Sequence, residues 1–183
     1  MDASQYEVQE RLRDGTPVTL RAVRSDDKAR LRRAFHELEQ ASVYTRFFTT
    51  KQDVSDEELA AGVDVDFVRN VTLVVTPGDS DVIIGAGRYI GIGDSADAEV
   101  AFTVEEDYHG QGIASMLLHH LAGIARAHGF RHLCAEVLAA NRGMLRVFES
   151  SGLPMSRHRD EDMVRVTLAL GEAPAPEKPG RPP

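Results

Sequence analysis

The feature that most constrains this chain is a glycine-containing turn, residues 107–115, between a strand-like run and an amphipathic helix. The run covers residues 98–104, and the helix is expected over residues 115–128. Gly110 and Gly112 allow positive φ angles and a close approach of the backbone to a ligand. The N–H groups that begin the helix, together with the helix dipole, favour an anion at this turn. The sequence therefore predicts a strand–turn–helix unit that binds a pyrophosphate group.

Three types of phosphate-binding loop compete as interpretations of this turn. A dinucleotide-binding fingerprint needs a third glycine where this chain has Ser115, and it belongs to the first strand–helix turn of a domain. A kinase-type loop needs a Gly-Lys pair, which the sequence does not contain. The third pattern, Gln/Arg-x-x-Gly-x-Gly/Ala, corresponds to residues 109–114, with His109 at its first position.

Length, charge and cysteine content limit the class of protein. At 183 residues the chain fits one domain, and its apolar runs are far shorter than the roughly 18 residues of a membrane span. Residues 1–7 lack the basic and apolar regions of a signal peptide, and a single cysteine, Cys134, excludes an internal disulfide. We therefore expect a cytoplasmic protein. A formal net charge of −8 argues against nucleic-acid binding, which needs clustered lysine and arginine.

The order of the predicted elements indicates one α/β (α+β) domain over residues 16–170. Residues 1–15 are expected to be a flexible lead-in, and the proline-rich residues 171–183 are expected to be disordered. Strands are predicted at residues 18–23, 71–76, 82–92, 98–104, 132–139 and 163–170, and helices after Ser25, after Ser55, at 115–128 and at 141–148.

These segments, in this order, resemble the GNAT superfamily of acetyl-CoA-dependent N-acetyltransferases. The resemblance rests on the strand with Glu99, the loop at residues 109–114 with the helix after it, and Asn141 before the last helix. Residues 18–24 and 42–48 are more similar to the bacterial protein lysine acetyltransferase (Pat-like) branch. The resemblance implies a single GNAT-like domain with a mixed, mostly antiparallel sheet of six to seven strands, about four helices and splayed central parallel strands.

The resemblance also implies a binding site for acetyl-CoA. The backbone near Phe102 and Val104 is expected to pair with the pantetheine arm and to hold the acetyl carbonyl. Two positions depart from the family pattern: His109 replaces glutamine or arginine, and Phe148 stands where many members carry a tyrosine that is thought to protonate the leaving thiolate. The implied cofactor-binding residues are Phe102, Thr103, Val104, His109, Gly110, Gln111, Gly112, Ile113, Ala114, Ser115 and Asn141.

The reaction implied by the resemblance is transfer of an acetyl group to a primary amine. The ammonium of lysine has a pKa near 10.4, so its deprotonation at pH 7 costs roughly 4.6 kcal/mol. A carboxylate close to the amine can accept this proton directly or through water. Glu99, an isolated acid in an otherwise apolar strand where a buried charge is costly, is predicted to be this general base. The alternatives are an outward-facing or arginine-paired Glu99, with Glu105 and Glu106 as reserve candidates.

A protein lysine is the first hypothesis for the acceptor, since an acidic protein suits a basic partner. A small-molecule amine acetyltransferase, acting on a polyamine or an antibiotic, is a second hypothesis. A catalytically weak CoA-binding sensor is a third hypothesis, from a different class. No metal site is expected, because neighbouring helical residues such as His119 and His120 point about 100° apart.

Several other residues have structural interpretations. Cys134 is predicted to be a core residue, and His128 is predicted to pack against or cap the end of its helix. Asn141 is predicted to cap the last helix and, by resemblance, to contact the cofactor arm as well. The basic residues within 28–33 are interpreted as a solvated face. By the resemblance, residues 44–48 fall where the acceptor cleft is expected. Packing in the core is the first interpretation of Phe47 and Phe48, and contact of Arg46 with the acceptor or the cofactor is an alternative.

Overall fold

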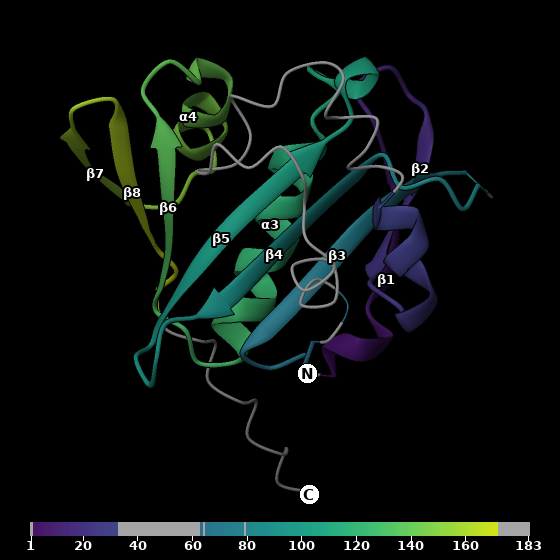
Figure 1. Ribbon diagram of the computed structural model, residues 1–183, viewed down its shortest axis with the longest axis horizontal. Helices are drawn as coiled ribbons and strands as arrows, with labels where there is room; N and C mark the ends of the chain where they lie inside the picture. Colours follow the sequence, from purple (N-terminus) through teal and green to yellow (C-terminus); the bar gives the residue numbers. More distant parts are fainter. Residues whose placement is uncertain (1, 33–62, 64, 79, 172–183) are drawn as a thin grey trace, which may run out of the picture.

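A mixed sheet of eight strands forms the centre of the protein, in the order β1-β2-β3-β4-β5-β6-β8-β7 (Figure 1). The computed structural model describes residues 2–32, 63, 65–78 and 80–171. Neighbouring strands are antiparallel except for the central pair β5 and β6, which is parallel. The strands are β1 (Glu7–Arg11), β2 (Pro17–Ala22), β3 (Asn70–Pro77), β4 (Gly85–Gly91), β5 (Asp97–Val104), β6 (His132–Leu138), β7 (Met155–Asp160) and β8 (Met163–Ala169). The helical elements with full bounds are η1 (Ala3–Gln5), η2 (Ser25–Asp27), η4 (Glu106–Tyr108), α3 (Ile113–Ala127) and α4 (Arg142–Glu149).

The predicted GNAT-like architecture is confirmed, but the sheet has more strands than the expected six to seven. The expectation of a flexible lead-in over residues 1–15 is wrong for β1, which pairs along its whole length with β2. Ala3 and Leu12, on either side of β1, are buried and fix it to the core. β7 was not predicted either, because its exposed, polar residues show no apolar alternation. Pairing with β8, a tertiary contact, makes it a strand.

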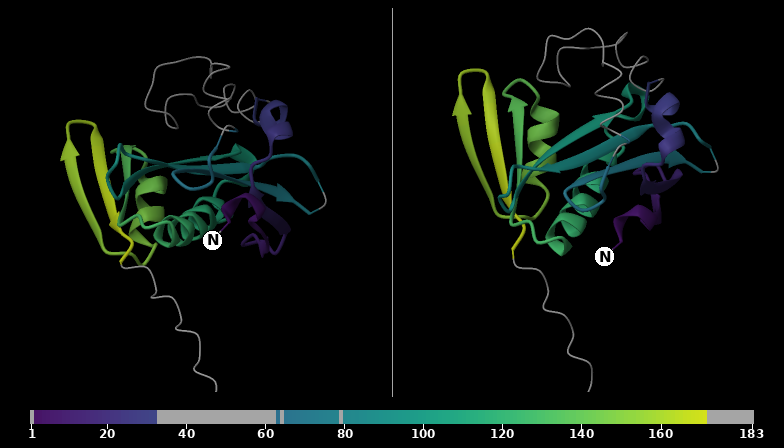
Figure 2. Two further views of the ribbon diagram at one scale, coloured as in Figure 1. Left: turned by 90° about the horizontal axis from the view of Figure 1, so that it is seen from below. Right: turned by 60° about the horizontal axis from the view of Figure 1, so that its bottom comes forward.

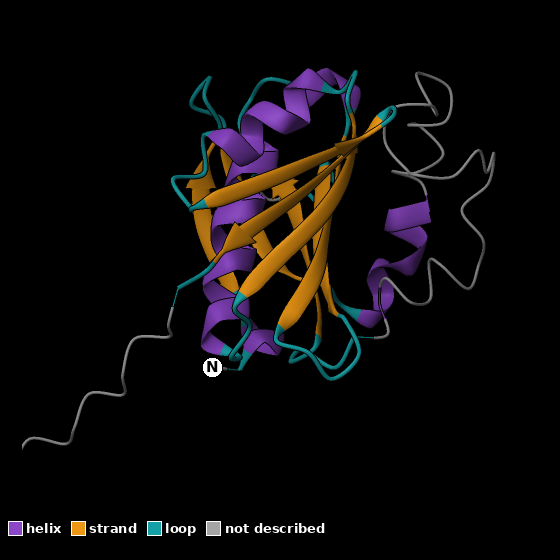
Figure 3. Ribbon diagram, turned by 90° about the vertical axis from the view of Figure 1, so that its left-hand side faces the viewer, coloured by secondary structure: helices purple, strands orange, loops and turns teal. Residues whose placement is uncertain are grey.

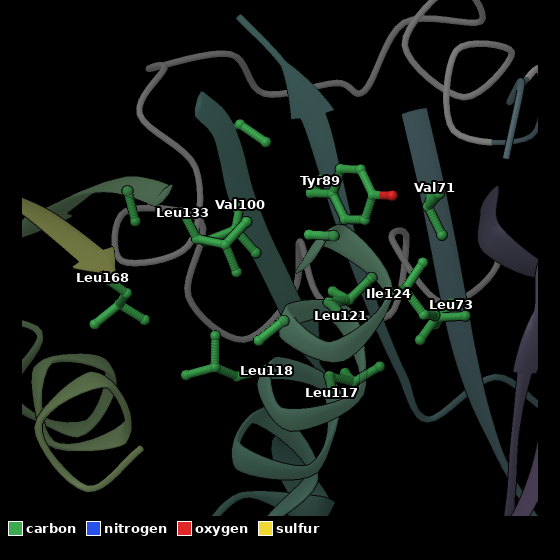
Figure 4. Packing of buried hydrophobic residues seen from close by; sticks show 14 of the residues in the cluster. Val71, Leu73, Tyr89, Val100, Leu117, Leu118, Leu121, Ile124, Leu133 and Leu168 are labelled. Carbon is green, nitrogen blue, oxygen red and sulfur yellow. The ribbon is translucent and has the colours of Figure 1, made fainter. Parts of the chain in front are cut away.

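Helix α3 covers one face of the sheet and carries most of the hydrophobic core (Figures 3 and 4). The stripe predicted from the sequence, Leu117, Leu121 and Ile124, is fully buried where α3 packs against β3, β4 and β5. Burial of each such side chain contributes about 1.5–3 kcal/mol. A Cβ added at Gly85 of β4 would lie 2.6 Å from Ile113 Cγ2, so glycine lets the first turn of α3 rest directly on the sheet. None of the helices in the described part of the chain has the length and apolar character needed to cross a bilayer.

The opposite face of the sheet holds a second, smaller cluster of Val23, Leu31, Val74 and Ile83. Helical residues 28–32 lie on this side, across the sheet from α3 (Figures 2 and 3). The predicted solvated basic face is only partly correct, since Arg30 forms ion pairs with Asp26, Asp27 and Asp81. Arg33, residues 44–48, the helix expected after Ser55 and residues 172–183 lie outside the described residues.

A buried ion pair ties the start of this second layer to β2. Arg21 donates two hydrogen bonds to Asp27, from Nη1 to Oδ2 at 2.7 Å and from Nη2 to Oδ1 at 2.9 Å. The backbone N–H of Arg24 also donates to Asp27 Oδ2, at 2.7 Å. The side chain of Asp27 is fully buried and that of Arg21 is 6% exposed. The direction in which the chain leaves β2 is therefore fixed by a carboxylate that is satisfied by several donors.

Candidate active site

The glycine turn has the backbone geometry that the sequence predicts. Gly110 and Gly112 have φ angles of 79° and 91°, and Gly112 is the left-handed N-cap of α3, without a side-chain cap. The helix begins at Ile113, two residues before the predicted Ser115. Among the described residues, no group accepts a hydrogen bond from the N–H of Ile113, Ala114 or Ser115. These three donors and the positive end of the helix dipole form a place for an anion.

Replacing Gly112 with alanine should lower the free energy of unfolding by about 1–2 kcal/mol, because a Cβ is strained at this positive φ. The Cβ itself would meet only the Arg13 side chain, at distances of 3.5–3.9 Å. Gly123 offers a matched control, because it lies within α3 and a Cβ there meets nothing within 4 Å. Gly123→Ala is expected to raise the same free energy by about 0.5–1 kcal/mol. Urea unfolding of both variants measures the two effects, and equal shifts would contradict the strain at residue 112.

Two residues of the β1–β2 turn hold the glycine loop from outside. Arg13 Nη1 donates to Gly110 O at 3.0 Å, and the backbone N–H of Arg13 donates to Gln111 O at 3.1 Å. The backbone N–H of Asp14 donates to Gln111 Oε1 at 3.2 Å. This places the guanidinium of Arg13 beside the amides that begin α3. No sequence pattern points to Arg13, because only the pairing of β1 with β2 brings it near residues almost a hundred positions away.

The side chains of the loop are already engaged with the protein. His109 Nε2 donates to Val104 O at 3.0 Å and so ties the loop to the end of β5. The Gln111 side chain accepts from Asp14, as described above. The predicted contacts of these two residues with a diphosphate therefore depend chiefly on their backbone, and they stay predictions.

The two parallel strands separate beside this loop, as Figure 1 shows. Their pairing runs from Asp97 opposite His132 to Glu99 opposite Cys134 and then ends. Beyond Glu99, β5 remains paired with β4, whereas β6 remains paired with β8. Among the strands that the structure describes, none pairs with the second edge of β5 at residues 101–104. The predicted cofactor positions Phe102, Thr103 and Val104 all lie on this edge, which leads directly into the loop.

Glu99 lies where the two strands part. Ala98 and Val100 are buried on the α3 side, so strand alternation turns Glu99 to the opposite face, together with Ala101 and Thr103. The predicted face is confirmed, but the expected burial is wrong, because Glu99 is exposed. Within residues 2–32, 63, 65–78 and 80–171, no arginine, lysine or histidine forms an ion pair with it. The carboxylate is thus accessible to an incoming amine.

Helix α4 follows β6, the strand that separates from β5 after Glu99. Asn141 caps the helix, its Oδ1 accepting from the N–H of Met144 at 3.0 Å, which confirms the structural prediction. Phe148 is 1% exposed and packs against Phe102, with ring centroids 6.1 Å apart, so it is a core residue. Ser150 Oγ donates to Arg146 O at 2.7 Å, and so caps the helix.

The remaining sequence interpretations concern cysteine and histidine. Cys134 is not a core residue: it is half-buried on the face of Glu99, and Leu133 and Ala135 fill the core instead. Burial raises the pKa of the Cys134 thiol, which keeps the thiolate scarce at neutral pH. His128 caps α3, and its Nδ1 lies 2.9 Å from Tyr89 Oη. His120 lies between Tyr6 and Glu10, and the described residues contain no cluster of ligands for a metal ion.

Comparison with known proteins decides the family. The model of the acetyltransferase (GNAT) domain matches residues 18–154, which is most of the chain. The chain belongs to the GNAT acetyltransferase family. This GNAT domain is 31% identical over 137 residues to acetyltransferase PA5475 of Pseudomonas aeruginosa, with 74% of each protein covered. It is 30% identical over 172 residues to acetyltransferase Pat of Mycolicibacterium smegmatis, covering 93% of the chain but 50% of that protein.

The fold of this GNAT domain agrees with solved structures. The GNAT domain of S. lividans PAT superposes with a TM-score of 0.79 at 33% identity, covering 89% of the chain and 96% of that domain. An acetyltransferase from Salmonella typhimurium, solved with its cofactor acetyl-CoA, superposes with a TM-score of 0.70 at 19% identity, a likeness in fold alone. It covers 87% of this chain and 98% of the other. Membership of the GNAT family, rather than this likeness in fold, identifies the protein as an N-acetyltransferase that uses acetyl-CoA.

Proposed function

We propose that this GNAT enzyme acetylates the side-chain amine of a protein lysine, with Glu99 as the general base. One observation carries the proposal: Glu99 lies at the point where β5 and β6 part, on the face opposite α3, with an accessible carboxylate. The amine of an acceptor that approaches this face comes close to the open edge of β5. Glu99 takes the proton from the ammonium, which leaves a neutral nitrogen with a lone pair for acyl transfer.

The residues of the glycine loop and of the β5 edge beside it fit acetyl-CoA. The unbonded amides of Ile113, Ala114 and Ser115 suit a diphosphate, and Arg13 adds a positive charge beside them. The edge of β5 at residues 101–104, which no described strand pairs with, suits the amides of a pantetheine arm, because such an arm can pair with backbone as a strand would. When bound, acetyl-CoA supplies an acetyl group activated as a thioester. The chain's own part is to hold the cofactor, to orient it along β5 and to accept the proton at Glu99.

Similarity to the Pat proteins favours a protein lysine over a small amine. Pat of Mycolicibacterium smegmatis and the PAT domain of S. lividans resemble this chain at 30% and 33% identity. The chain spans half the length of the first of these proteins, so the activity of the whole of that protein is not carried over.

A direct assay separates the three functional hypotheses. The protein is incubated with acetyl-CoA and either host-cell protein, spermidine or no acceptor, and thiol release is measured together with mass spectrometry for acetyl-lysine. We expect acceptor-dependent thiol release and new acetyl-lysine on protein. Release that depends on spermidine but not on protein supports the small-amine alternative. Tight binding of acetyl-CoA by calorimetry, with no acetylated product from any acceptor, identifies a sensor and overturns the proposal.

A further inference from the structure

Arg88 lies in the middle of β4, on the same face of the sheet as Glu99. Its neighbours point the other way: a Cβ on Gly87 would meet Leu121 of α3 at 3.1 Å, and Tyr89 is fully buried. Alternation along the strand therefore directs Arg88 away from α3. β4 is an interior strand, paired with β3 on one side and β5 on the other, so this arginine is only half-exposed.

Arg88 has no counter-charge among the described residues, in contrast to other arginines of the protein. Its register partners on the two neighbouring strands are Thr72 and Ala101, and neither of them is charged. A half-buried guanidinium next to neutral residues leaves five N–H donors to be satisfied. The arginines that do contact a carboxylate include Arg21, Arg30, Arg157 and Arg165.

The hydroxyl beside Arg88 is also without a partner. Thr72 is 4% exposed, and its buried Oγ1 forms no hydrogen bond with any residue that the structure describes. Buried polar groups in native proteins are nearly always hydrogen-bonded, so an unpaired hydroxyl needs an explanation. Arg88 and Thr72 are directly opposite in the β3–β4 register, so two unsatisfied groups lie next to each other.

The spacing between Arg88 and Glu99 matches a ligand that carries both charges. Ile90 is opposite Glu99 and Arg88 is opposite Ala101, so Arg88 and Glu99 are diagonal neighbours on one face. Diagonal positions on an antiparallel pair are about 7–8 Å apart, and these two side chains form no ion pair. One acceptor molecule can therefore place a cationic amine at Glu99 and an anionic group at Arg88.

We infer that Arg88 and Thr72 bind a carboxylate of the acceptor that lies close to the amine being acetylated. The inference rests on the proposed function and names the acceptor class of the same site. A guanidinium binds a carboxylate with two parallel hydrogen bonds, and the Thr72 hydroxyl adds a third donor. The carboxylate comes from an acidic residue next to the lysine in a protein, or from the acid group of a small amino acid. In a chain of net charge −8, this local cation selects acceptors that the overall charge repels.

Paired acceptors test the inference. Two short peptides contain one lysine, followed by glutamate in one and by glutamine in the other, and 6-aminohexanoate is compared with hexylamine. We expect the wild-type KM to be about 10-fold to 100-fold lower for the acidic member of a pair. Preference within the peptide pair assigns the carboxylate to a protein acceptor, and preference within the small-amine pair alone assigns it to a free amino acid. Equal KM values in both pairs overturn the inference.

Variants of Arg88 test whether this residue causes the preference for acidic acceptors. Arg88→Gln is expected to raise KM for the acidic acceptor to that of the neutral one, so that the preference within each pair is lost. Arg88→Lys is expected to keep part of the preference, since lysine supplies the positive charge but not the two parallel N–H donors of a guanidinium. Arg157→Gln, on the exposed edge strand β7, is the control and should keep the full preference. A preference that survives in Arg88→Gln overturns the inference.

Failure of the proposed function gives a different result. If the wild type binds acetyl-CoA but acetylates none of the four acceptors, the proposed function fails, and the inference that rests on it fails too. If all four acceptors are acetylated without regard to their charge, only the inference about Arg88 and Thr72 fails. Binding of the acetylated acidic peptide, measured by calorimetry with the wild type and Arg88→Gln, gives a second readout that is independent of turnover.

Discussion

Replacing Glu99 with glutamine is expected to lower kcat by about 10²–10⁴-fold while the affinity for acetyl-CoA stays unchanged. Glutamine keeps the size and hydrogen-bonding capacity of the side chain but cannot accept a proton at neutral pH. The reaction then depends on the small fraction of acceptor lysine that is already neutral. Since that fraction rises about tenfold per pH unit below a pKa near 10.4, the deficit of the variant should narrow between pH 7 and pH 9. Steady-state thiol release measures kcat, and calorimetry measures the affinity.

Three further glutamates sharpen this test. Glu136 is exposed on the neighbouring strand β6 and pairs with Arg165 at 2.7 Å, so Glu136→Gln is expected to leave kcat unchanged. Glu105 and Glu106 follow the end of β5 and were the reserve candidates. A large loss of kcat in Glu106→Gln or Glu105→Gln, with an unaltered rate in Glu99→Gln, would move the general base to the end of the strand.

Replacing Asp27 with alanine is expected to lower the free energy of unfolding by about 3–5 kcal/mol. Such a loss is typical when one partner of a buried ion pair is removed, since the other charge stays buried without compensation. Here the uncompensated group is Arg21, whose side chain is 6% exposed. Asp26 provides the control, because its side chain is 66% exposed and its ion pair with Arg30 is at the surface. Asp26→Ala should change the free energy by less than about 1 kcal/mol in urea unfolding.

The same carboxylate makes stability depend on pH. Burial by itself raises the pKa of Asp27, but hydrogen bonds from Arg21, from the Arg24 backbone and from Arg30 outweigh it, so the pKa lies below its ordinary value of 3.8. A lowered native pKa stabilises the fold above that ordinary value, and the stabilisation is lost as pH falls through the native pKa. Wild-type stability should therefore fall more steeply below pH 4 than that of Asp27→Asn. Parallel curves for the two proteins would contradict this assignment.

Local backbone chemistry made part of the site predictable from the sequence. Gly110 and Gly112 were identified as positions of positive φ, and both have it. Alternation in β5 predicted that Glu99 faces away from Val100, and the structure agrees. The burial of Glu99 was predicted wrongly, because the apolar character of a strand does not reveal which of its faces a helix covers. Cys134 was misassigned for the same reason.

Contacts between distant segments were beyond the reach of sequence patterns. β1 is polar and short, with three of its five residues exposed and none buried, so no apolar periodicity marks it as a strand. Once it pairs with β2, Arg13 lies beside Gly110, although nothing in the glycine motif points to an arginine so far away. Arg88 was not singled out either, because its meaning comes from the residues beside it on β3 and β5. The register between neighbouring strands determines which residues lie beside Arg88, and sequence patterns do not reveal that register.

The attachment of β1 to α3 has a consequence for the order of events in folding. Tyr6 Oη lies 2.6 Å from His120 Nδ1, His120 Nε2 lies 3.0 Å from Glu10 Oε1, and Arg13 reaches Gly110. The first and last of these contacts join residues separated by 114 and 97 positions, so they close very long loops at a large entropic cost. During synthesis β1 can pair with β2 early, but the contacts of Tyr6 and Glu10 with His120 form only after α3 has emerged from the ribosome. The contacts of Arg13 with the glycine loop thus form late, after the strands between residues 13 and 110 have been synthesised.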